Sequence, residues 1–142
     1  MTDAALPITG GCVCGAVRYA IAAEPLGART CWCRYCQHIA AGSASVNAIF
    51  PARAVTIGGP IRHFERIADS GNHMKSGFCP DCGTQLTSAS TERAHLLIVR
   101  VGTLDEPDRI APQATIWADA APHWAPIDPD LPRHGRQPPP VA

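Results

Sequence analysis

The feature that most constrains this chain is the distribution of its seven cysteines into three short blocks. The middle block, Cys31-Trp-Cys-Arg-Tyr-Cys36, places three thiols within one short segment. One pair precedes it at Cys12 and Cys14, and a second pair follows it at Cys79 and Cys82. An odd number of thiols cannot complete a set of disulfides, so this spacing favours metal ligation. The seven thiols divide naturally into a group of four and a group of three.

Thiols separated by one or two residues are typical of zinc sites, in which four ligands surround the ion as a tetrahedron. The two outer pairs together supply four ligands and predict a closed structural site that joins distant parts of the chain. The middle thiols leave a zinc ion one ligand short, and three protein ligands with an exchangeable fourth are the arrangement of catalytic zinc. The sequence therefore predicts two zinc sites, one structural and one catalytic, the second held by Cys31, Cys33 and Cys36.

Two other arrangements of the middle thiols are open at this point. His38 lies two residues beyond Cys36 and would close the second site as a set of three cysteines and one histidine. A mixed site would instead combine Cys36 with the late pair, Cys79 and Cys82. If both sites are closed and structural, the chain is a zinc-stabilised binding module without catalysis.

Length and charge limit the classes of protein further. The 142 residues suffice for one domain with its own core, and 12 basic residues balance 12 acidic ones. Nucleic-acid binders usually carry a basic excess, so a nucleic-acid partner is disfavoured. No apolar run reaches the roughly 20 residues of a membrane span, and the first residues lack the pattern of a signal peptide. We expect a cytoplasmic monomer or homodimer, in a compartment where thiols stay reduced.

The chain is predicted to be mainly β, a single domain of antiparallel sheets with cysteine knuckles and little helix. Val17, Tyr19 and Ile21 alternate with small or polar residues, which is the period of a half-buried strand. Residues 95–101 form the most apolar run and predict the central strand, and any helix should be short and close to Cys36. Further strands are expected at residues 45–50, 85–90 and 113–117, and residues 54–57 and 61–67 are expected to pair as a hairpin around Gly58-Gly59-Pro60.

Prolines recur from Pro126 onward with little apolar sequence between them. This composition is typical of a segment that is either an extended wrap or disordered. The chain is accordingly divided into a zinc-binding domain at residues 1–125 and a proline-rich C-terminal tail at residues 126–142.

Three sequence blocks follow one another in order: GGCVCGAVRY at residues 10–19, CWCRYC at residues 31–36 and GFCPDCGT at residues 77–84. They resemble the signature of the glutathione-dependent formaldehyde-activating enzyme family, which also includes centromere protein V. The resemblance covers roughly residues 8–132 and implies a β-tent zinc fold. It implies that the outer cysteines hold the structural zinc and the middle ones the catalytic zinc. It also implies a carbon–sulfur lyase-type reaction, in which glutathione and formaldehyde combine to form S-hydroxymethylglutathione.

A small-molecule thiol substrate, with glutathione as a possible co-substrate, makes further demands on the site. Glutathione carries two carboxylates and one ammonium, so its site should offer arginine or lysine. Arg34 lies inside the middle cysteine block and is predicted to bind the co-substrate and to offset the charge of three thiolates. Arg62, Arg66 and Lys75 are alternative candidates on nearby predicted strands.

Overall fold

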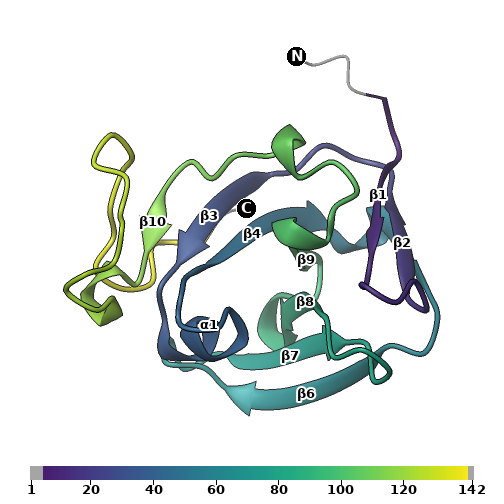
Figure 1. The fold of residues 1–142 in the computed structure, drawn as a ribbon, viewed down its shortest axis with the longest axis horizontal. Coiled ribbons are helices and arrows are strands. Elements are labelled where there is room, and N and C mark those ends of the chain that lie inside the picture. Colours follow the sequence, from purple (N-terminus) through teal and green to yellow (C-terminus); the bar gives the residue numbers. More distant parts are fainter. Residues whose placement is uncertain (1–4, 141–142) are drawn as a thin grey trace.

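Two β-sheets build the described part of the protein, residues 5–140 of a computed structural model (Figure 1). Residues 1–4 and 141–142, the outer ends of the predicted domain and of its tail, lie outside the described residues. The strands are β1 (Ile8–Gly11), β2 (Arg18–Ile21), β3 (Gly27–Cys31), β4 (Ser45–Pro51), β5 (Val55–Gly58), β6 (Arg62–Ile67), β7 (His73–Phe78), β8 (Gln85–Ser90), β9 (Leu96–Arg100) and β10 (Thr115–Ile116).

Within residues 5–140 the fold is mainly β, as predicted, and its single α-helix is short. The smaller sheet has the order β1-β2-β5, and the larger sheet has the order β10-β3-β4-β9-β8-β7-β6. Neighbouring strands are antiparallel except that β10 runs parallel to β3. The helices are α1 (Arg34–Ile39) and the 3-10 turns η1 (Ala52–Ala54), η2 (Thr91–Arg93), η3 (Val101–Thr103), η4 (Pro107–Arg109) and η5 (Ala118–Ala120).

The hydrophobic core joins the small sheet to the large one. Ile21 of β2, Phe50 of β4, Leu86 of β8 and Val99 of β9 are all fully buried in the same cluster. Burying a side chain of this size contributes about 1.5–3 kcal/mol to stability. The alternation predicted for residues 17–21 is confirmed, because its apolar members are buried while the side chains between them are not.

The prediction that residues 95–101 form the central strand is also confirmed. Strand β9 lies at the middle of the large sheet, between β4 and β8. Its residue Val99 lies opposite Ala48 on β4, and both are fully buried. One face of this strand, with Leu97 and Val99, therefore contacts the core, while Leu96 and Ile98 on the other face line a cavity.

The predicted hairpin of residues 54–57 and 61–67 is wrong. Strand β5 pairs with β2 in the small sheet, whereas β6 pairs with β7 at the edge of the large sheet. In the observed register Val55 lies opposite Ile21 and Ile57 opposite Tyr19, so the apolar residues of β5 pack onto β2. Pro60 has no backbone N–H to donate, which suits a crossing between sheets better than a hairpin ladder.

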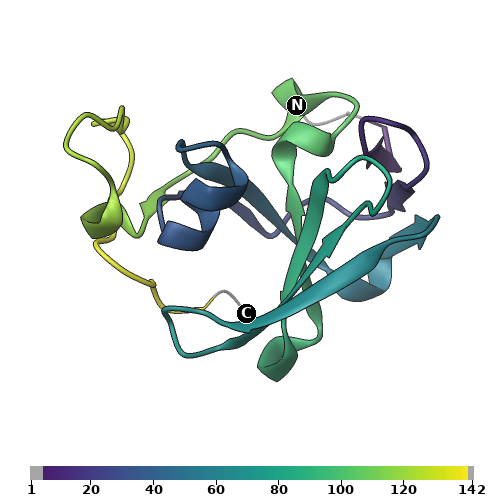
Figure 2. The same ribbon diagram turned by 60° about the horizontal axis from the view of Figure 1, so that its bottom comes forward.

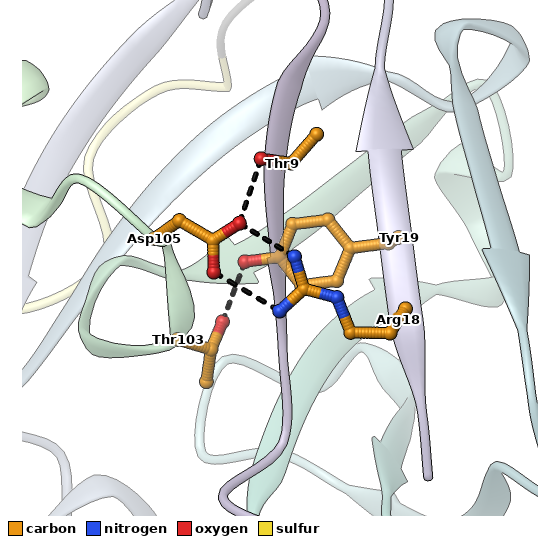
Figure 3. Close-up of polar contacts among 5 residues, drawn as sticks. All are labelled: Thr9, Arg18, Tyr19, Thr103 and Asp105. Atoms are coloured by element: carbon orange, nitrogen blue, oxygen red, sulfur yellow. Dashed lines mark hydrogen bonds and ion pairs between the residues drawn. The ribbon is translucent and has the colours of Figure 1, made fainter. Parts of the chain in front are cut away.

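Polar contacts fasten the small sheet to the loop that follows β9 (Figure 3). Arg18 of β2 donates two hydrogen bonds, of 3.0 and 2.5 Å, to the Asp105 carboxylate. The Thr9 hydroxyl donates a third to Asp105 at 2.7 Å. The Tyr19 and Thr103 hydroxyls share a hydrogen bond of 2.7 Å. The Arg18 hydrogen bond, followed by that of Thr9, lowers the pKa of Asp105 to about 2.

The tail lies along β10 as an extended wrap, which decides between the two alternatives for its described residues. Thr115 donates its backbone N–H to the carbonyl of Pro132 at 2.9 Å and accepts one from His134 at 2.8 Å. Figure 2 shows the tail, in yellow, continuing toward the turn between β6 and β7. The boundary at residues 125 and 126 stays a prediction. Among residues 5–140, no helix is long and apolar enough to cross a membrane.

Candidate metal centres and their cavity

The four outer cysteines meet although they come from distant parts of the chain. Their sulfur atoms all lie within 4.8 Å of one another. The distance between the sulfurs is 3.5 Å for Cys12 and Cys14 and 3.8 Å for Cys14 and Cys79. A zinc–sulfur bond of about 2.3 Å gives a tetrahedral sulfur–sulfur distance of about 3.8 Å. The donor set and its spacing therefore fit a zinc ion, with Cys82 as the fourth ligand.

Two knuckles of the backbone aim these thiols at a common point. In the first knuckle, the Val17 backbone N–H donates to the sulfur of Cys12 at 3.2 Å. This hydrogen bond is the first cause of the lowered pKa of Cys12, because it stabilises the thiolate. Gly15 and Gly83, one in each knuckle, have φ angles of 82° and 81°. Glycine adopts this left-handed conformation without the strain that a β-carbon would add.

The three middle cysteines form a second group, within 4.8 Å of one another. Cys31 is the last residue of β3, and Cys33 caps the N-terminus of α1 by accepting the backbone N–H of Cys36 at 3.5 Å. The strand end and the first helical turn thus bring all three sulfurs to one side. Ile116 and Trp117 pack against them, and the group is buried.

Each group contains a thiol whose pKa is lowered by its neighbours. Hydrogen bonds from Thr84 lower the pKa of Cys82 to about 5. Hydrogen bonds with Cys31 and then with Cys36 lower the pKa of Cys33, whereas the hydrogen bond with Cys33 is the first cause of the raised pKa of Cys31. One thiol in each group is therefore stabilised as the thiolate, which is the form that binds metal.

The two alternative ligand sets do not form. The exposed His38 ring places its Nδ1 2.6 Å from the Arg34 carbonyl oxygen, and His38 belongs to neither group of metal-ligand atoms among the described residues. Cys36 lies with Cys31 and Cys33 and not with the late pair. The structure thus brings the cysteines together in the predicted division of four and three.

A cavity of about 370 Å³ opens onto the three-thiol group. None of the four outer cysteines lines it. Of the residues that the structure describes, four arginines and one carboxylate, that of Asp69, line this cavity, which makes it cationic. Gln137, Pro138 and Pro140 of the tail form part of its wall. The four arginines are Arg29, Arg66, Arg93 and Arg100.

The predicted basic candidates are distributed unevenly around this cavity. Arg34 is exposed and is not among the lining residues. Arg62 and Lys75 are exposed on β6 and β7 and do not line the cavity either. Arg66 does line it, and its guanidinium lies over the ring of Tyr35, 3.6 Å from the ring centroid. Arg34 is instead the exposed first residue of α1, and its guanidinium donates to the Gln37 side-chain oxygen at 2.5 Å.

Sequence reasoning missed Arg29, Arg100 and the contribution of the tail. Arg100 carried a signal, because it is a charged residue inside the most apolar run in the chain. Arg29 precedes Cys31 by two residues, so the two share one face of any strand that contains both. No pattern in the sequence indicates that Gln137 reaches the cavity wall.

The fold and the site define a small, mainly β protein with two groups of cysteines able to hold metal ions. The family model described as glutathione-dependent formaldehyde-activating enzyme matches residues 7–120. The chain belongs to this family.

Comparison with individual proteins adds support for the fold. A Rhodobacter sphaeroides protein of known crystal structure is similar, with a TM-score of 0.55 and 21% sequence identity. The similarity covers 69% of this chain and 88% of that chain. No curated protein matches the chain.

Proposed function

We propose that the protein is a zinc-dependent carbon–sulfur lyase-type enzyme that acts on S-hydroxymethylglutathione, or on a related adduct of a thiol with formaldehyde. The observation that carries this proposal is the position of the three-thiol group at the wall of the cavity. A volume of about 370 Å³ lies in the range of small-molecule sites. Membership of the family supports the choice of glutathione and formaldehyde.

Cys31, Cys33 and Cys36 would hold the working ion, and their three sulfurs fit three corners of a tetrahedron. Zinc bound in this way supplies a position for a substrate thiol and lowers the pKa of that thiol. In the synthetic direction a bond forms between the thiol sulfur and the formaldehyde carbon. The carbonyl oxygen gains a proton and the thiol loses one, so the reaction balances without an oxidant or reductant.

The residues around the thiols would exclude bulk water from this step. Ile116 and Trp117 are buried against the cysteines. Trp117 adopts a left-handed backbone conformation, with φ of 56°, and its indole N–H donates to the Gln137 side-chain oxygen at 2.9 Å. This hydrogen bond fastens the tail to the cavity wall. A dry, fixed wall favours a substrate thiolate held by the metal over one solvated by water. Free thiols in both clusters suit the cytoplasm, which we propose as the compartment.

The exchange rate between the formaldehyde–glutathione adduct and its free components tests the proposal. NMR exchange spectroscopy would measure this rate with zinc-loaded protein, with Cys33→Ser protein and without protein. We expect the intact protein to raise the rate and the Cys33→Ser variant to leave it at the uncatalysed value. His38→Ala is the matched control, since it alters the same segment without removing a thiol, and it should retain the rate increase. An unchanged rate with fully zinc-loaded protein would contradict the proposal.

A further inference from the structure

Three polar side chains form one row across the middle of the large sheet. Arg29 on β3 lies opposite Asn47 on β4, and Asn47 lies opposite Arg100 on β9. Residues that are opposite one another in a sheet project from the same face. All three line the cavity that opens onto the middle cysteines. The row therefore presents two guanidinium groups to the inside of the cavity.

Arg100 is held rigidly but is not fully paired. It is only 8% exposed, and one guanidinium nitrogen, Nη1, donates to the Asn47 side-chain oxygen at 2.6 Å. The Asn47 amide N–H donates in turn to the Ser45 hydroxyl oxygen at 3.0 Å. The Nε of Arg100 is buried and has no hydrogen-bond partner among the described residues. A buried donor left in this state costs free energy, and a ligand oxygen would remove that cost.

Arg29 is a second cation that forms no ion pair with a carboxylate of the described residues. Its side chain is half-buried in the cavity wall, so the guanidinium has lost part of its water. The ion pairs within residues 5–140 include neither Arg29 nor Arg100. Asp69, the one described carboxylate at the cavity wall, is exposed and lies in the turn after β6. Buried charges in proteins are normally paired, so the structure leaves room here for an anion supplied by a ligand.

We propose that Arg29 and Arg100 form a subsite for a carboxylate of the substrate. Guanidinium groups match carboxylates in shape and form charge-assisted hydrogen bonds with them. Arg29 and Cys31 are two residues apart on one strand, so they share a face and lie about 7 Å apart along it. A substrate whose sulfur reaches the cysteine group can thus place a carboxylate about 7 Å away along the same strand, beside Arg29. This subsite makes the enzyme selective for thiols that carry a carboxylate over neutral thiols.

The selectivity among thiols rests on the proposed function, but binding of a carboxylate to the subsite can be tested without any thiol. Glutarate, a dicarboxylate that contains no sulfur, would be titrated into the zinc-loaded full-length protein, with NMR of the arginine side-chain N–H groups as the readout. We expect a saturable shift of the Arg100 Nε–H signal. Arg29→Gln should weaken glutarate binding about tenfold or more, as expected for loss of a charge-assisted contact.

The controls separate a local subsite from general charge attraction. Arg53→Gln removes an exposed arginine that does not line the cavity and should leave the affinity unchanged. Dimethyl glutarate, which has the same length without charge, should not shift the Arg100 signal. Arg29→Gln removes no hydrogen bond within the described residues, so it should fold normally even if a change at Arg100 does not. Absence of a saturable shift, equal affinity of Arg29→Gln and wild type, or tighter binding of inorganic phosphate than of glutarate would overturn the proposal.

A second measurement separates failure of the subsite from failure of the proposed reaction. Adduct exchange would be compared for glutathione and for its diethyl ester, which keeps the thiol and loses both carboxylate charges. We expect the wild type to prefer glutathione about tenfold or more and Arg29→Gln to lose most of that preference. Catalysis of both thiols at equal rates would support the reaction and overturn the subsite. Glutarate binding that depends on Arg29, without any thiol exchange, would support the subsite and contradict the reaction.

Discussion

Both clusters consist of cysteine thiols, but the surroundings of the two clusters are opposite. The outer cluster joins two knuckles that are far apart in the chain, and two of its members, Cys14 and Cys82, are exposed. The middle cluster comes from one short segment and is buried, yet it lines the cavity. The comparison teaches that exposure of the sulfur does not determine which cluster opens onto the cavity. The number of thiols and access from the cavity are what distinguish the two clusters, and the proposed function rests on that difference.

The two clusters also contribute differently to folding. The outer cluster joins the ends of a long loop of chain, so a metal ion bound there would fix the relative position of the small and large sheets. The middle cluster closes only the short connection from β3 into α1. Backbone hydrogen bonds already hold that connection, including one of 3.0 Å from Gln37 N–H to the Cys33 carbonyl. Loss of metal should therefore affect the fold mainly at the outer cluster.

The largest effect is expected from Cys82→Ser. This thiol is exposed, so the change removes a metal ligand with little loss of buried surface. We expect the variant to lose one zinc ion and to become several kcal/mol less stable, because structural zinc binding is folding free energy. Zinc analysis and thermal melting would measure both. Asp81→Ser is the matched control at an exposed neighbour and should melt like the wild type.

Cys33→Ser should have the opposite combination of effects. The variant should stay folded, with the melting temperature of wild-type protein that has no metal in the middle site. It should no longer raise the rate of adduct exchange. Circular dichroism and the NMR exchange rate would be measured on the same samples. If Cys33→Ser and Cys82→Ser collapse alike, both clusters are structural and the comparison between them fails.

A smaller effect is expected from Asp105→Asn, which weakens the contacts between the small sheet and the loop after β9 without changing a metal ligand. The folded-state pKa of Asp105 is about 2, below the unfolded value of about 3.9. The carboxylate therefore stabilises the fold above about pH 4, and this contribution is lost as the pH falls through about 2. Asp105→Asn should melt earlier than the wild type at pH 7, and the difference should shrink between about pH 4 and 2. A difference in melting temperature that does not vary with pH would contradict this assignment.

His38→Ala should have the smallest effect of the series. Because the His38 ring lies against the Arg34 carbonyl and outside both clusters, its removal should leave the zinc content unchanged. Zinc analysis of the purified variant would measure this. Loss of one zinc ion would show that His38 closes the middle site.

The metal groups could be predicted from sequence because knuckle spacing is a local property of the chain. The same holds for β2 and β9, whose alternation or apolar run marks a buried face. Even the odd number of cysteines was informative, since it excluded a complete disulfide framework. These features need no knowledge of which strands lie side by side.

The remaining parts depend on strand pairing, which local patterns do not determine. Strand β3, with the sequence GARTC, shows no clear alternation, and its partners come from later in the chain. The charged row of the cavity exists only because β4 lies between β3 and β9. The false hairpin at residues 54–67 has the same origin, because two neighbouring strands joined different sheets. The hydrogen bond between the Trp117 indole and the Gln137 side chain likewise follows from the path of the tail.

Cadmium NMR of protein with cadmium in place of zinc tests the central difference between the clusters most directly. Each bound ion gives its own signal, so ligands added to one site are seen separately from the other. We predict two signals, of which one moves when glutathione is added and disappears in Cys33→Ser, while the other stays fixed. Two signals that ignore glutathione, or that move together, would contradict the account of one closed and one open site.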